Sequence, residues 1–146
     1  MKIWDSIPAN PFTGLIAKTE SAFGLPSTLL ARIAWIESRF NPNAHNASGA
    51  TGIMQIVPAA HPGVNASDPN EAIPYAAKYL KSLYNMFGSW DKAIVAYNWG
   101  QGNLQKAISA YGNVNWKYHI PSESANYLAQ VQAVIDLPPG AKTTMI

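Results

Sequence analysis

The sequence contains no cysteine, so the protein is neither a disulfide-stabilised protein nor a zinc protein of the cysteine-ligated kind. Without cysteine the chain can form neither a disulfide framework nor a cysteine-ligated zinc site. Its three histidines, His45, His61 and His119, lie far apart in the sequence and form no HExxH-type metal motif. We therefore predict that the protein uses no metal and no organic cofactor, and that the histidines are surface or hydrogen-bonded structural residues.

Charged residues and long apolar runs are also scarce. Charged side chains make up 12% of the 146 residues, and the net charge is +2. The basic residues are scattered instead of forming a stripe, so we expect no nucleic-acid partner. No segment approaches the roughly 18 consecutive apolar residues of a membrane-spanning helix, so we expect no membrane insertion. A surface rich in uncharged polar side chains suits neutral, hydroxyl-rich ligands.

The residues that are present predict a single, mainly α domain. Apolar residues make up 48% of the chain, and its length is that of one ordinary domain, with a core over about residues 12–136 and a tail at 137–146. No segment alternates with period two, so we expect at most a small β element between residues 41 and 57. Residues 68–71 (DPNE) resemble a capping box with proline at the first helical position. Pro74 complicates a single helix here, so we expect the regular part of the third helix to start at Pro74. The predicted helices cover residues 11–23, 26–38, 74–87, 90–99, 104–110 and 122–136.

Glu37 stands at the end of an apolar stripe on the second predicted helix. The apolar positions recur at helical spacing and are Leu30, Ile33 and Ala34. A carboxyl group at such a place is poorly solvated, and the helix C-terminus disfavours its negative charge, so both effects should raise its pKa. A carboxylic acid that stays protonated near neutral pH suits general-acid catalysis at a glycosidic oxygen. The alternative is an ordinary helix-end glutamate that pairs with Arg32 or Arg39.

Two further segments combine glycines, amides and aromatic side chains. Residues 49–56 (GATGIMQI) place two glycines around a turn before an apolar strip, which is typical either of a ligand-contacting turn or of a surface turn leading into the core. Residues 96–100 (AYNWG) end a predicted helix with a phenol, an amide and an indole. This pattern fits either a sugar site or a core helix with a polar end. We expect most of the tryptophans to pack in the core. For Trp99 and Trp116, packing in the core and contact with a ligand groove are equally weighted alternatives.

Taken together and in order, these segments resemble a known motif set. Glu37-Ser38, residues 49–56 and residues 96–100 are similar to the motifs of the soluble lytic transglycosylase (SLT) domain, of the lysozyme-like superfamily. A fourth segment, IPSESANYL at residues 120–128, resembles the family's Glu-Thr-Arg-x-Tyr-Val motif, although Ala125 stands where the family has arginine. The resemblance covers about residues 12–135.

The resemblance implies a helical, lysozyme-like fold of the goose-type lysozyme and SLT kind, with a groove for peptidoglycan glycan strands. It also implies cleavage of the β-1,4 bond between N-acetylmuramic acid and N-acetylglucosamine, in which the muramic acid O6 attacks its own C1 and leaves a 1,6-anhydro end. By this likeness Glu37 protonates the leaving oxygen and then accepts the proton from O6, and Tyr97 holds Glu37 in position. The implied substrate-binding residues are Ser38, Met54, Gln55, Tyr97, Asn98, Trp99, Glu123 and Tyr127.

Two other functions are kept as alternatives. A hydrolytic muramidase on the same fold would need a residue that positions water, and the candidates are Asp68, Glu71 and Asp91. A non-catalytic glycan-binding module of a virion would have no need of the acid. Residues 1–12 lack the apolar segment of a signal peptide. We therefore expect a monomeric phage or prophage enzyme that reaches the bacterial cell wall through lysis machinery or as a virion component.

Overall fold

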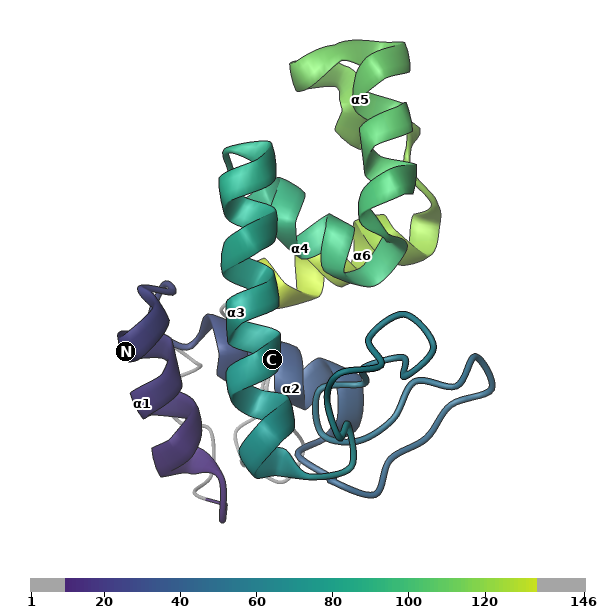
Figure 1. Cartoon of the computed structure of the whole chain (residues 1–146). Helices are drawn as coiled ribbons and strands as arrows, with labels where there is room; N and C mark the ends of the chain where they lie inside the picture. Colours follow the sequence, from purple (N-terminus) through teal and green to yellow (C-terminus); the bar gives the residue numbers. More distant parts are fainter. Residues whose placement is uncertain (1–9, 134–146) are drawn as a thin grey trace. The chain divides into compact units, whose positions relative to one another are not determined.

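The computed structural model describes residues 10–133, which form helices joined by loops (Figure 1). Within this part of the chain no β-strand is present, and residues 41–57 carry two isolated antiparallel bridges, His45 to Thr51 and Thr51 to Ile56. The prediction of a mainly α fold with at most a small β element there is confirmed. The helices are α1 (Thr13–Phe23), α2 (Leu29–Ser38), α3 (Pro69–Phe87), α4 (Trp90–Trp99), α5 (Gln101–Asn115), the short 3-10 helix η2 (Trp116–His119) and α6 (Ser122–Gln132).

The chain divides into two compact units, and α3 belongs to both. The first unit holds α1, α2, the loop that follows and α3 as far as Lys78, and the second runs from Tyr79 to Gln132. The prediction that they act as one catalytic domain stays a prediction. The last helix starts at Ser122 as predicted but ends at Gln132, before the expected end. That expected end at Asp136 and the expected tail at 137–146 lie outside the described residues.

In the first unit, α1 packs against α2, and a buried carboxylate joins them. Gly24 ends α1 in the left-handed conformation (φ 68°), as its position after Phe23 predicted. Glu20 reaches across the turn and accepts hydrogen bonds from the backbone N–H groups of Thr28, Leu30 and Ala31 at 3.1, 2.8 and 3.1 Å. These donors belong to the start of α2, where N–H groups have no partner within the helix.

The long connection between α2 and α3 (residues 39–68, blue to teal in Figure 1) folds through successive turns. Gly52 has a φ of 79°, and a Cβ placed on it would lie 2.0 Å from the carbonyl oxygen of Ala66. Two distant parts of the loop therefore approach each other backbone to backbone, which requires glycine at this position.

Helix α3 begins at Pro69, the first helical position that the sequence predicted, and it is already regular before Pro74, where the regular part was expected to start. Proline at the first helical position loses no intrahelical hydrogen bond, and Asp68 accepts from the N–H of Asn70 at 2.9 Å, so the end is well capped. Pro74 removes one donor without ending the helix. Glu71 accepts from the N–H of Asn65 at 3.2 Å, so it secures the preceding loop instead of completing a capping box.

The second unit has its own core, formed where α4 packs against α5 and α6. Helix α4 has the predicted bounds, and Ser89 caps it by accepting from the N–H of Lys92 at 3.3 Å. Helix α5 is longer than predicted because it begins at Gln101 and continues past a non-helical residue, Gly112 (φ 91°), as far as Asn115, next to η2. The buried core residues are Leu83, Ala93, Val95, Ala96, Leu104 and Trp116.

Candidate functional site

Glu37 is the penultimate residue of α2, and the helix around it has the predicted amphipathic pattern. Leu30, Ile33 and Ala34 are fully buried, whereas Glu37 is half-buried at the end of the same stripe. Arg39 caps the helix in the left-handed region (φ 55°), and its guanidinium carbon lies 4.2 Å from the centroid of the Trp35 ring. The first unit therefore presents a half-buried carboxyl group at the end of α2.

Ser38 ties the end of α2 to the Gly49–Ile56 segment. Its hydroxyl lies 2.7 Å from the carbonyl oxygen of Ile53 and 3.0 Å from that of Ala34, and the side chain is buried. The two motifs that the sequence placed next to each other in function thus meet through a backbone hydrogen bond. The geometry assigns the Ser38 hydroxyl to backbone contacts.

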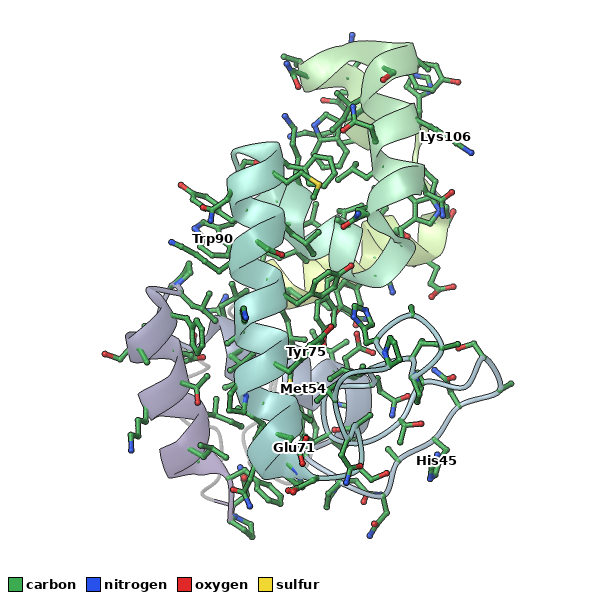
Figure 2. All side chains as sticks on the ribbon, viewed as in Figure 1. His45, Met54, Glu71, Tyr75, Trp90 and Lys106 are labelled. Carbon is green, nitrogen blue, oxygen red and sulfur yellow. The ribbon has the colours of Figure 1, made fainter. Side chains whose placement is uncertain are left out.

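Met54 and Gln55 lie in the same segment but are placed differently. Met54, labelled in Figure 2, is fully buried. Gln55 is half-buried with a φ of 50°, and its amide nitrogen donates to the carbonyl oxygens of Ala44 (3.1 Å) and Gly52 (2.9 Å). Both amide protons of Gln55 therefore stabilise the loop, and its amide oxygen is the group left for a ligand.

In the second unit, the third and fourth motifs meet at Asn98. Its Oδ1 accepts a 2.8 Å hydrogen bond from the hydroxyl of Ser124, on the first turn of α6. The neighbouring Tyr97 and Trp99 are half-buried and pack against the core of this unit, and the Tyr97 ring lies 5.9 Å from the Tyr79 ring between centroids. This end of α4 thus presents an amide between two aromatic side chains.

The remaining predicted residues of the second unit differ in exposure. Glu123 is exposed on the first turn of α6, whereas Tyr127 is buried. Trp116, one of the two tryptophans considered for groove contact, is 2% exposed and belongs to the core. Trp90 stacks on Tyr84 with 4.2 Å between ring centroids. Core packing therefore accounts for Trp116, as it does for most tryptophans in proteins.

The histidines have ordinary roles. Nδ1 of His61 lies 2.7 Å from the hydroxyl of Tyr75 on α3, and burial lowers the pKa of this histidine. His45 is exposed on the long loop (Figure 2), and His119 stacks on Tyr111 with 3.7 Å between ring centroids. Across residues 10–133, no three His, Asp or Glu side chains gather in a way that could hold a metal ion.

The motif set and this fold agree with a comparison against known families, in which the family described as "Transglycosylase SLT domain" matches residues 14–120. The chain belongs to this family. The sequence resemblance is therefore confirmed, and it covers most of the described residues.

Relatives of this SLT domain occur in phages and in bacteria. It is 33% identical to the peptidoglycan transglycosylase gp16 of Escherichia phage T7, over 94% of this chain and 11% of that protein. It is 31% identical to the transglycosylase of Enterobacteria phage PRD1, over 68% of this chain and 42% of that protein.

Among solved structures, the 70-kDa soluble lytic transglycosylase of Escherichia coli matches 82% of this chain with a TM-score of 0.70 and 30% identity. The SLT domain spans 22% of that chain. A second structure of a 70-kDa soluble lytic transglycosylase, in complex with bulgecin A, matches with the same TM-score and identity. The predicted lysozyme-like helical fold is therefore confirmed.

None of the helices in residues 10–133 is both long and apolar enough to cross a membrane.

Sequence reasoning missed two residues of this SLT domain that organise its structure. Glu20 joins α1 to α2, and Ser124 holds Asn98. No local pattern marks Glu20, because its partners follow a turn. Ser124 lies within the fourth motif, but its burial depends on how α6 packs against α4.

Proposed function

We propose that this SLT domain cleaves the β-1,4 bond between N-acetylmuramic acid and N-acetylglucosamine in peptidoglycan, with Glu37 as its single general acid and base. The observation that carries the proposal is the half-buried Glu37 carboxyl at the end of the buried α2 stripe, in a chain that belongs to this family. A departing glycosidic oxygen requires a proton donor, and a single carboxyl group that first gives and then accepts a proton meets this requirement.

The reaction then needs one carboxyl group and no water. Glu37 gives its proton to the oxygen that leaves C1 of the muramic acid as the glycosidic bond breaks. The muramic acid O6 forms the new bond to C1 and returns its own proton to the Glu37 carboxylate. The enzyme ends in its starting protonation state, and the products are a new sugar hydroxyl and a 1,6-anhydro end. A paired-carboxylate glycosidase would instead consume one water per bond.

The surroundings of Glu37 support a fixed position for its backbone. The hydrogen bond from Ser38 to Ile53 holds the end of α2 against the Gly49–Ile56 segment. We propose that Ser38 and the buried Met54 position this segment, while the Gln55 amide oxygen, Asn98, the half-buried faces of Tyr97 and Trp99, and the exposed Glu123 contact the glycan. The buried Tyr127 would support α6 from within. The names of the phage T7 and Escherichia coli relatives, a peptidoglycan transglycosylase and a soluble lytic transglycosylase, support the substrate and the reaction.

Mass spectrometry of digested peptidoglycan tests the proposal. Purified sacculi are incubated with wild-type protein, Glu37→Gln and Glu71→Gln in water enriched in oxygen-18. Glu71 is a matched control because it is an exposed glutamate of the first unit whose oxygen accepts a backbone hydrogen bond, which glutamine can retain. We expect unlabelled 1,6-anhydro products from wild type and Glu71→Gln, and at least a thousandfold slower release from Glu37→Gln, on the order of the loss when a catalytic group is removed.

The other possible outcomes separate the alternative functions. Reducing ends that carry oxygen-18 would identify a hydrolase that recruits water, and loss of activity in Glu71→Gln would then implicate Glu71 in positioning that water. Absence of any product, together with binding to sacculi, would identify a glycan-binding module. Either result would overturn the proposed reaction.

We propose a phage or prophage setting, in which the protein meets the bacterial cell wall during lysis or entry. The phage T7 and phage PRD1 relatives support this setting. A monomeric state and the absence of a cofactor stay predictions. Light scattering of the purified protein and activity after chelator treatment would check them, and a stable dimer or a marked loss of activity would contradict them.

A further inference from the structure

The hydrogen bond between Ser124 and Asn98 constrains an amide that would otherwise be free to turn over. Ser124 is 2% exposed, and Asn98 is half-buried at the end of α4. The Ser124 hydroxyl donates to Asn98 Oδ1 at 2.8 Å, and it makes no other hydrogen bond within residues 10–133. The carbonyl side of the amide is therefore occupied by a buried donor.

Turning the amide over would leave that donor without an acceptor. The Asn98 nitrogen would then face the Ser124 oxygen, and the serine O–H would have to lie unpaired inside the protein, which is unfavourable. The buried hydroxyl thus selects one of the two orientations of the amide. In that orientation the two N–H donors of Asn98 point away from Ser124, and across the described residues neither of them is hydrogen-bonded.

We infer that Ser124 is a positioning residue that directs the Asn98 N–H donors toward an acceptor-only group of the ligand. A sugar hydroxyl can donate or accept, so it could pair with either side of an amide. The carbonyl oxygen of an N-acetyl group can only accept, so it pairs only with the nitrogen side. The fixed amide therefore favours N-acetylated sugars over their free-amine forms, whose ammonium groups donate and do not accept. This inference rests on the proposed action on N-acetylated glycan.

Binding of two soluble sugars measures the effect directly. The probes are the β-1,4-linked tetramer of N-acetylglucosamine and the same tetramer without acetyl groups, titrated into the whole protein by calorimetry. We expect wild type to prefer the acetylated tetramer, and Ser124→Ala to bind it about tenfold more weakly, as the loss of one oriented hydrogen bond predicts. Ser124→Thr retains the hydroxyl and should restore the preference. Ser109→Ala, at an exposed serine of α5, is the matched control and should bind as wild type does.

A double-mutant comparison separates positioning from general support of the fold. Asn98→Asp keeps the oxygen that accepts from Ser124 but removes the N–H donors. In that background Ser124→Ala should cause no further loss of binding, because the donors it orients are already gone. An equal loss in both backgrounds, or wild-type binding by Ser124→Ala, would overturn the inference.

A measurement on wild-type protein keeps the test independent of folding in the variants. The side-chain amide signals of Asn98 in a nitrogen-15 NMR spectrum, assigned by their absence in Asn98→Asp, should shift when the acetylated tetramer binds. Binding without such a shift would overturn the role of Asn98 and Ser124 while leaving the cleavage proposal standing, since that is decided by the peptidoglycan products. If the protein binds the acetylated tetramer and the Ser124 and Asn98 variants show the expected coupling, but peptidoglycan is not cleaved, only the proposed reaction would be overturned. Failure of the acetylated tetramer to bind would overturn the inference.

Discussion

The Ser38 hydroxyl donates to the carbonyl oxygen of Ile53 at 2.7 Å, so the residue after Glu37 is bonded to a segment 15 positions further along the chain. A buried hydroxyl that satisfies a backbone carbonyl contributes stability and also limits the movement of its helix end. The candidate acid therefore stands next to an anchored residue, and this anchor can be tested separately from the chemistry.

Ser38→Ala should lower the free energy of unfolding by about 1–2 kcal/mol, because it removes the hydroxyl partner of Ile53 inside the protein. Urea denaturation followed by circular dichroism measures this change. Ser82→Ala is the matched control, because the Ser82 hydroxyl also donates to a backbone carbonyl, that of Tyr79, at 2.7 Å, but the side chain is exposed. Its stability should change by less than about 0.5 kcal/mol. Equal effects at both positions would contradict the anchoring role.

Gly52→Ala should destabilise the protein more than Gly49→Ala. Both glycines have a positive φ, 79° at Gly52 and 90° at Gly49. A Cβ on Gly52 would lie 2.0 Å from the Ala66 carbonyl oxygen, whereas one on Gly49 would meet nothing within 4 Å. We expect a loss of about 1–2 kcal/mol at Gly49 from backbone strain and a clearly larger loss at Gly52. Thermal denaturation of the two variants measures both losses. Similar losses would show that the loop moves to accommodate the Cβ at Gly52 without an additional loss of stability.

The pH dependence of stability should carry a contribution from Glu20. Burial raises the pKa of this carboxyl above its ordinary value of 4.5, although hydrogen bonds from Ala31, Thr28 and Leu30 and the charge of Arg32 oppose the rise. Because the pKa is higher in the folded protein, the contribution of Glu20 is most favourable below pH 4.5 and is lost as the pH rises through the folded-state pKa.

Glu20→Gln supplies the reference for that measurement, since glutamine does not titrate. The free energy of unfolding of wild type minus that of the variant, measured in urea from about pH 3 to pH 8, should fall as the pH increases and then become constant. A difference that grows with pH would mean that the three hydrogen bonds outweigh burial and that the pKa of Glu20 is lowered.

Pro74→Ala should stabilise the protein by about 1 kcal/mol or more. Alanine restores an N–H that can donate to the carbonyl of Asn70 and removes the ring that crowds it, which outweighs the greater freedom of the unfolded chain. Pro69→Ala is the control at the first position of α3, where proline costs no intrahelical hydrogen bond, and it should leave stability unchanged or lower. A destabilised Pro74→Ala would indicate that the ring itself packs usefully.

The elements that the sequence predicted well are those with local signals. Helix α4 has the predicted bounds because Ser89 and Gly100 supply its two ends within the same short stretch. Gly24 ended α1 for a similar reason. The start of α3 at Pro69 was also marked locally, but the sequence overestimated the effect of Pro74. The capping by Asp68 and the burial of Ala72 and Ile73 outweigh the penalty of that proline. The family follows from the order of the motifs along the chain, since each motif is a short run of neighbouring residues.

Periodicity alone determined the mainly α class and placed Glu37 at the end of a buried stripe, since both depend on spacing along one helix. The tertiary structure alone decided that Ser38 bonds to Ile53, that Gly52 meets Ala66, that Glu20 caps α2 and that Ser124 orients Asn98. Each of these pairs joins groups separated along the chain, and whether a given hydroxyl or carboxylate is buried beside its partner depends on how helices and loops pack. A hydrogen bond forms only where packing brings donor and acceptor together, and the distance between two such groups cannot be predicted from the identity of either residue.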